Sequence, residues 1–248
     1  MSGRRICILG GCGGIGRSLV AACLENGDDV AVLDLKTSLA RHPPPAAAYA
    51  IEVDGADEAS VARAFAAVSG RWPALDGFVN LAGFMIAVQP LAQTPIGDFD
   101  VTIGGNLRTA FLTCKAAMTL LEKGEGASLV NIASGLGGFI RAQYGPYAAA
   151  KAGIIALTKT LALEHAPRVR ANAVAPGVVD TAFLRGGTGR SEERNSSTID
   201  IPAYSALIPM RRVATPEDIA GPIMFLLSAQ SAYMTGQTLW VNGGNYMP

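Results

Sequence analysis

The 248-residue sequence predicts an α/β fold, in which about seven parallel strands form one doubly wound sheet with helices on both faces. Short, continuously apolar segments alternate along the chain with longer helical ones, and strands buried on both faces of a parallel sheet have this composition. No repeat or linker divides the chain, and 50% of its residues are hydrophobic. We therefore expect residues 1–248 to form a single domain around one large core.

The expected strands are short apolar runs, each followed by a turn or a helical segment. They are ICILG from Ile6, DVAVLD from Asp29, AYAIEVD from Ala48, LDGFVNLAG from Leu75, SLVNIAS from Ser128, VRANAVAPG from Val169 and TLWVNGG from Thr238. Helical segments begin at Gly16, Ala59, Pro95 and Tyr147, and three prolines at 43–45 mark a break.

The least regular segment is LRGGTGRSEERNSST, residues 184–198, which is rich in glycine, serine and charge. It predicts a mobile surface loop inside a longer flexible substrate loop at about 181–212. We expect this loop to fold over bound substrate, with its glycines as flexible points.

The charge pattern excludes several kinds of partner. Twenty basic residues balance twenty acidic ones without any basic block, so we expect no nucleic-acid partner. The apolar run near the N-terminus is five residues long before the glycines begin, too short for a signal-peptide core or a membrane span. These features predict a cytoplasmic protein with a small-molecule substrate and no membrane contact.

The cysteines predict neither disulfides nor a metal site. They form no C-x-x-C pair, and His42 and His165 are too few to complete a zinc ligand set. Scattered cysteines in a chain of this size favour a reducing compartment. The four are Cys7, Cys12, Cys23 and Cys114.

A glycine cluster follows the first strand, with the spacing Gly10-x3-Gly14-x-Gly16. A strand that runs through glycines into a helix offers backbone N–H groups and a helix N-terminus to a phosphate. The spacing differs from the G-x-G-x-x-G dinucleotide fingerprint, so a tight turn without a ligand is the alternative interpretation.

Asp34 ends the second strand, 24 residues after Gly10, which is about where an acidic residue binds the adenosine ribose hydroxyls. Its carboxylate would repel a 2′-phosphate, and neither Gly13 nor Leu35 supplies a positive charge, so we predict NAD rather than NADP. An ordinary acid in a turn is the alternative, and Lys36 lies nearby.

The segment YGPYAAAK, residues 144–151, carries a phenol and an ammonium at i and i+4. On a helix, Tyr147 and Lys151 lie on the same face, and a neighbouring cation is expected to lower the pKa of the phenol. Tyr144 has no such partner, because Ala148 stands at its i+4 position. One packing aromatic residue and one solvated lysine is the alternative interpretation.

From Ile6 to Gly244 the chain resembles the short-chain dehydrogenases/reductases, whose fold is Rossmann-like. Ser134 stands 13 residues before Tyr147, Tyr147-x3-Lys151 resembles the signature pair, and PEDIAGPIMFLLS from Pro216 resembles the C-terminal helix. The resemblance implies a cofactor site formed by Gly10, Gly13, Gly14, Ile15, Gly16, Asp34, Asp54, Asn80, Ala82, Gly83, Tyr147, Lys151, Pro176, Gly177, Val179 and Thr181. Leu9 and Leu81 depart from the family pattern, so we expect weaker local ordering or weaker cofactor binding, and no loss of chemistry.

The resemblance also implies a catalytic set. Tyr147 would exchange a proton with the substrate oxygen, and Lys151 would lower the pKa of the phenol and hold the nicotinamide ribose. Ser134 would stabilise the substrate oxygen, and Asn106 would hold a water that relays protons to Lys151. Taken singly, Ser134 and Asn106 could equally be a turn residue and a helix-interior amide. No role is expected for Lys159 or His165.

The expected substrate pocket is mostly apolar, which predicts a small to medium hydrophobic ketone or secondary alcohol. Arg141 and Arg185 are cations that could meet an anionic group, and the sequence does not choose between them. The helix from Tyr147 is apolar around most of its circumference, and the resemblance implies a homotetramer interface there. The pocket residues are Phe84, Met85, Gly135, Leu136, Phe139, Tyr144, Phe183 and Leu184.

The sequence therefore predicts an NAD(H)-dependent oxidoreductase that transfers a hydride between the nicotinamide and a secondary alcohol or ketone. A 3-oxoacyl-thioester (acyl-carrier-protein) reductase is the alternative among enzymes, although Asp34 argues against its usual NADP. A non-catalytic NAD(H) sensor or scaffold is the alternative of another class.

Overall fold

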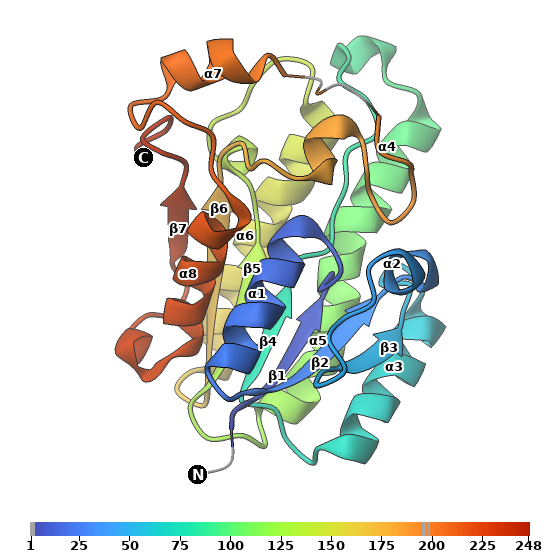
Figure 1. The fold of residues 1–248 in the computed structure, drawn as a ribbon, viewed down its shortest axis with the longest axis vertical. Helices are drawn as coiled ribbons and strands as arrows, with labels where there is room; N and C mark the ends of the chain where they lie inside the picture. Colours follow the sequence, from blue (N-terminus) through green and yellow to red (C-terminus); the bar gives the residue numbers. More distant parts are fainter. Residues whose placement is uncertain (1–2, 195–196, 198) are drawn as a thin grey trace.

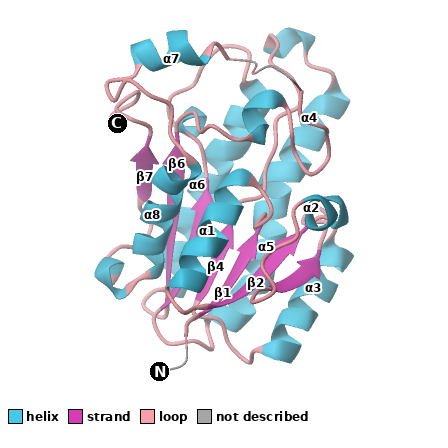
Figure 2. Cartoon of the chain, viewed as in Figure 1, coloured by secondary structure: helices cyan, strands magenta, loops and turns pink. Residues whose placement is uncertain are grey.

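The computed structural model describes residues 3–194, 197 and 199–248. Within them lies a sheet of seven parallel strands in the order β3-β2-β1-β4-β5-β6-β7, with helices on both faces, so the predicted fold is confirmed (Figures 1 and 2). The strands are β1 Arg5–Leu9, β2 Asp29–Asp34, β3 Tyr49–Glu52, β4 Gly77–Asn80, β5 Ala127–Ile132, β6 Val169–Pro176 and β7 Thr238–Val241.

Two helices, α2 and α7, were not predicted from the sequence. The helical segment predicted from Pro95 is not one continuous α-helix. It contains α4, a π-helical turn at Gly104–Arg108, and α5. In the expected loop at 184–198, positions 195, 196 and 198 lie outside the described residues. The helices are α1 Gly14–Glu25, α2 Lys36–Arg41, α3 Glu58–Arg71, α4 Ile96–Ile103, α5 Thr109–Leu121, α6 Gly145–His165, α7 Ile201–Leu207 and α8 Pro216–Leu227.

The core lies on both faces of the sheet because successive strand residues point to opposite sides. Cys7 and Leu9 of β1 pack into the cluster with α3 and α5, whereas Ile6 and Ile8 pack into the cluster with α1 and α8. Continuous apolar strands are therefore required, as the sequence pattern indicates.

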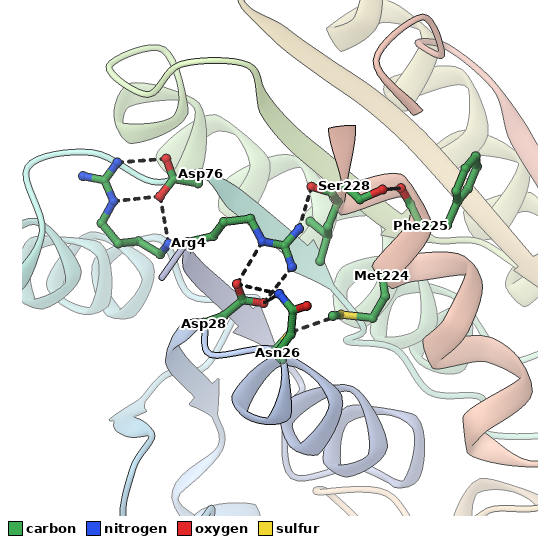
Figure 3. Close-up of polar contacts among 10 residues, drawn as sticks. Arg4, Asn26, Asp28, Asp76, Met224, Phe225 and Ser228 are labelled. Atoms are coloured by element: carbon green, nitrogen blue, oxygen red, sulfur yellow. Dashed lines mark hydrogen bonds and ion pairs between the residues drawn. The ribbon is translucent and has the colours of Figure 1, made fainter. Parts of the chain in front are cut away.

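Two arginines before and within β1 fix the amino-terminal edge of the sheet (Figure 3). Arg4 donates to both carboxylate oxygens of Asp28, at 2.9 and 2.7 Å, and to the carbonyl of Leu227 at the end of α8. Arg5 donates to both oxygens of Asp76 at 2.8 Å. These bidentate pairs lie at the end of the strands opposite the site, and they hold α1, α8 and β4 in place around β1.

The strand order reverses between β1 and β4, which leaves a crevice at the carboxyl ends of these strands.

All four cysteines are free and buried. Among the described residues, no helix combines the length and the hydropathy needed to cross a membrane. No group of three or more His, Cys, Asp or Glu side chains that could hold a metal ion gathers in the described part of the chain.

Candidate active site

A cleft of about 720 Å³ opens at the carboxyl ends of the strands. Every substrate-pocket residue named from the sequence lines it. So does every cofactor residue named from the sequence except Asp54 and Asn80. Asn106 lies behind the cleft wall, where its neighbour Gly105 lines the cavity. The tertiary structure thus brings together residues that are separated by up to 174 positions in the chain.

The glycine turn between β1 and α1 is packed so closely that side chains would not fit. A Cβ on Gly16 would lie 2.2 Å from the carbonyl oxygen of Gly10, and one on Gly14 would lie 2.6 Å from Cγ2 of Thr181. Gly10 itself has φ +81°, a conformation that favours glycine. No side chain caps the start of α1, and its first turn contains no acidic residue. This end of the cleft therefore fits a dinucleotide pyrophosphate, which backbone N–H groups and the helix dipole would hold.

Asp34 lies where β2 ends, beside the glycine turn. Its two carboxylate oxygens accept backbone N–H bonds from Cys12 at 2.9 Å and Leu35 at 2.8 Å, which fixes the carboxylate at the mouth of the turn. Arg17 and Arg41 also line this end of the cleft, and sequence reasoning did not consider either. Neither arginine stands beside Asp34 in the sequence, so only the fold reveals this cationic environment.

Two other predicted cofactor residues have partners within the protein. Asn80 is buried, accepts a hydrogen bond from the N–H of Ala82 at 3.1 Å and donates one to Asn131 at 3.3 Å, so it shapes the turn after β4. Asp54 follows β3 and pairs with Arg190 at 2.5 Å.

The loop after β6 therefore extends to the adenosine end of the cleft. Thr37 Oγ1 at the start of α2 donates to the carbonyl of Gly189 at 2.8 Å, and the guanidinium carbon of Arg190 lies 5.8 Å from the ring centroid of Phe84. Described residues of the loop thus contact both the substrate side and the adenosine side.

The signature pair lies in the first turns of α6, which begins beside Tyr144 and has a proline in its first turn. Lys151 Nζ lies 5.6 Å from the ring centroid of Tyr147 and donates to the carbonyl of Ile132 at 3.0 Å. Ser134 follows β5 and accepts a hydrogen bond from the N–H of Leu136 at 3.2 Å, and its hydroxyl lies near enough to the phenol of Tyr147 to lower the pKa of that phenol. The hydroxyls of Ser134 and Tyr147 and the amine of Lys151 therefore meet on one wall of the cleft.

The pKa directions correct one sequence prediction. Burial raises the pKa of Tyr147 to about 12, and the hydrogen bond from Ser134 offsets this only in part. Burial lowers the pKa of Lys151 to about 7. The expected lowering of the phenol pKa by Lys151 is therefore wrong for the protein alone, because desolvation disfavours the charged form of both groups.

Asn106 lies in the π-helical turn and is fully buried. Its amide nitrogen donates to the carbonyls of Phe84 at 2.7 Å and Thr102 at 2.8 Å, while its Oδ1 has no partner among the residues described. A Cβ on Gly83 would lie 2.5 Å from this Oδ1 and 3.0 Å from Lys151 Nζ. The amide oxygen and the amine therefore approach the same point. π-Helical turns are frequent at functional sites, and this one places Asn106 there.

The substrate end of the cleft contains residues that sequence reasoning missed. Tyr204 of α7 and the C-terminal residues Asn245 and Tyr246 line it together with the predicted aromatic side chains. The aromatic and polar character of the segment GGNYMP was the available signal. The rings of Tyr147 and Phe183 lie 6.1 Å apart, which brings the loop after β6 against the signature tyrosine.

A glycine turn for a pyrophosphate and a Ser-Tyr-Lys set in one cleft of a doubly wound sheet define a dinucleotide-dependent class of oxidoreductase. Comparison with known proteins agrees. A family model described as "Enoyl-(Acyl carrier protein) reductase" matches residues 11–245. The chain is 30% identical to sorbitol dehydrogenase of Cereibacter sphaeroides, over all of this chain and 99% of that protein.

Two further relatives are similar. An uncharacterized short-chain type dehydrogenase/reductase of Sinorhizobium fredii is 36% identical over 98% of this chain, which spans 43% of that relative's length. A glucose/ribitol dehydrogenase structure from Brucella melitensis superimposes with a TM-score of 0.87 at 28% identity, over 99% of this chain and 97% of that one. This chain belongs to the short-chain dehydrogenase/reductase family.

Proposed function

We propose that the protein transfers a hydride between NAD(H) and a secondary alcohol or ketone, with Tyr147 as the general acid/base. The observation that carries this proposal is the meeting of Ser134, Tyr147 and Lys151 on one cleft wall that continues into the glycine turn. A sensor or scaffold has no physical need for a buried amine beside a phenol, because burying an ionisable group is unfavourable.

When bound, the nicotinamide supplies or accepts the hydride. Tyr147 donates its phenolic proton to the ketone oxygen during reduction and receives it back during oxidation. Ser134 donates a hydrogen bond to the same oxygen and stabilises its developing negative charge. Because burial raises the pKa of Tyr147 to about 12, the phenol is protonated at neutral pH and ready for reduction.

Lys151 holds the nicotinamide ribose and passes protons onward. Its pKa of about 7 lets the amine exchange a proton near neutral pH. The buried Oδ1 of Asn106 faces the same point as this amine, so a water held between them would connect Lys151 to solvent.

A matched pair of variants tests the acid/base role. Oxidation of a panel of secondary alcohols with NAD is followed by the absorbance of NADH. Tyr147→Phe is expected to lower kcat by roughly a hundred- to ten-thousandfold, because proton transfer in the transition state is lost. Tyr144→Phe, which removes the other phenol of the same segment, is the control and keeps turnover within a few-fold. Retention of most turnover by Tyr147→Phe would overturn the assignment.

We also propose NAD rather than NADP, on the carboxylate of Asp34 at the adenosine ribose position. Arg17 and Arg41 at the same end make a direct titration necessary. NADH is expected to bind at least tenfold more tightly than NADPH. The reverse order would favour the alternative function, a 3-oxoacyl-thioester reductase.

For the loop at 181–212, we propose that closure depends on the cofactor. Arg190 pairs with Asp54, one of the residues expected at the cofactor, and the carbonyl of Gly189 accepts a hydrogen bond from Thr37 Oγ1. Hydrogen exchange of residues 186–194, measured for the free protein, for the NAD complex and for the NAD complex with substrate, tests this. Unchanged protection on binding of both ligands would count against it.

A homotetramer in the cytoplasm completes the proposal. Exposed apolar side chains on α5 and α6, such as Phe111 (50% exposed) and Leu163 (85%), support an interface between copies of this chain. The free, buried cysteines suit a reducing compartment. Sedimentation that gives a monomer at micromolar concentration would refute the tetramer.

A further inference from the structure

The substrate end of the cleft has a fixed aromatic wall. Phe139 stacks on Tyr246 with ring centroids 5.4 Å apart, and Trp240 packs edge-on against Tyr246 at 5.0 Å. Asn245 donates to the hydroxyl of Tyr204 at 3.2 Å, which ties the C-terminal segment to α7. Elements from three distant parts of the chain therefore form one surface at this end.

Arg141 lies on this surface, with its guanidinium carbon 5.4 Å from the ring centroid of Phe139, and it lines the cleft. No carboxylate pairs with it among the described residues. Arg185, the other candidate from the sequence, pairs with both Asp180 and Glu193. The structure thus separates two cations that the sequence left equivalent.

Of the other arginines that line the cleft, Arg17 and Arg41 lie at its adenosine end, whereas Arg190 lies against the ring of Phe84 but is already paired with Asp54. The pKa of His42 is lowered, first by burial and then by the positive charges of Arg17 and Arg41. Arg141 instead acts on Tyr204, whose pKa is raised by burial and lowered in part by this cation. Among the arginines that line the described cleft, Arg141 is therefore the one at the substrate end that no described carboxylate pairs with.

The backbone around Arg141 is held on both sides. Gln143 has φ +74°, a rare conformation outside glycine, and its carbonyl accepts a hydrogen bond from the N–H of Gln89 at 3.1 Å. A Cβ on Gly138 would lie 2.3 Å from the ring of Trp240, so the loop also lies close against β7. A guanidinium on a fixed loop, with one face on an aromatic ring, keeps its N–H edge free for an anion.

We propose that the substrate carries an anionic group, a carboxylate or a phosphate, at the end remote from the reacting carbon, and that Arg141 binds it. This rests on the proposed oxidoreductase function. Arg141 is exposed to the cleft, and a charge-assisted hydrogen bond to its guanidinium is roughly twice as strong as one between neutral groups, so an anionic group is favoured there over a neutral polar one. The proposal refines the predicted hydrophobic substrate to one with an apolar middle and a charged end.

The test compares 5-hydroxyhexanoate with its methyl ester, which share the reacting carbon and differ in charge. For Arg141→Gln, kcat/KM for the acid is expected to fall roughly ten- to a hundredfold, mainly through KM, while the ester changes less than twofold. Arg141→Lys restores part of the loss. Arg63→Gln removes an exposed positive charge on α3, outside the cleft, and is the matched control, expected to leave both substrates unchanged. 5-Hydroxyhexyl phosphate distinguishes a phosphate-selective site from a carboxylate-selective one.

Equal effects of Arg141→Gln on the acid and the ester, or no effect on either, would overturn the proposal and leave the oxidoreductase function intact. Calorimetric binding of hexanoate and hexanamide to the protein–NADH complex provides a second readout that needs no turnover. Hexanoate is expected to bind more tightly than hexanamide in the wild type and equally in Arg141→Gln. If no substrate is turned over, but hexanoate still binds more tightly than hexanamide in the wild type and not in Arg141→Gln, the oxidoreductase function alone is refuted.

Discussion

The buried amine of Lys151 has a measurable effect on stability. Its side chain is 2% exposed, and burial lowers its pKa from 10.5 to about 7. Between these two values the unfolded chain binds more protons than the native protein, so stability rises with pH. Below pH 7 both states carry the proton, and the full cost of a buried charge, about 5 kcal/mol, is present.

Replacement by Met removes this titration, so Lys151→Met is expected to lose the corresponding pH dependence. Between pH 7 and pH 9, the free energy of unfolding of the wild type should increase by about 2 kcal/mol relative to that of the variant. Urea denaturation of both proteins without cofactor at pH 6, 7, 8 and 9 measures this difference. The buried cysteines, whose pKa values burial raises, also titrate, but they affect both proteins equally and cancel.

The control is Lys115→Met, at an exposed position on α5, which is expected to leave the pH dependence of wild type unchanged. The changed shape of the Met side chain alters stability equally at every pH, so it does not disturb the comparison. Parallel curves for wild type and Lys151→Met, within about 0.5 kcal/mol, would show that the lysine is not held in a desolvated site.

Two further substitutions test the glycine turn and the opposite edge of the sheet. Gly16→Ala places a Cβ 2.2 Å from the carbonyl oxygen of Gly10, so we expect at least a tenfold loss of NADH affinity in fluorescence titration; Gly70→Ala, where nothing lies within 4 Å, should bind normally. Arg4→Met leaves the buried carboxylate of Asp28 without its bidentate partner and should lower the free energy of unfolding by about 2 kcal/mol in urea. Adding Asp28→Asn should recover part of that loss, and no recovery would contradict the role assigned to the ion pair.

Local pattern was sufficient for the strands and for most of the helices. Their apolar runs and helical periodicities are properties of neighbouring residues, so the seven strands and the parallel sheet follow directly. Short elements such as α2 and α7 were missed because six or seven residues carry too little periodicity to be recognised. The π-helical turn at Asn106 has no sequence signature of its own, because the residues around it read as one continuous helix.

The candidate site likewise combines features that are local in the sequence with features that depend on the whole fold. The spacing of Tyr147 and Lys151 on one helix, the glycine turn and Asp34 at the end of a strand are local features, and the chain itself specifies them. The pKa directions of Tyr147 and Lys151 depend on how much protein surrounds each group. Desolvation is a sum over distant segments, so the sequence spacing predicted the neighbours correctly and the direction of the phenol shift incorrectly.

By itself, the sequence determined the fold class, the family and the chemical identity of the groups around the cleft. Only the tertiary structure decided which charges are already paired. Arg185 pairs with Asp180 and Arg190 with Asp54, whereas no carboxylate of the described residues pairs with Arg141. The physical reason is that an ion pair requires two charges within about 4 Å. For Arg190 and Asp54 the fold brings together segments 136 positions apart, and for Arg185 and Asp180 the distance depends on the conformation of the loop after β6.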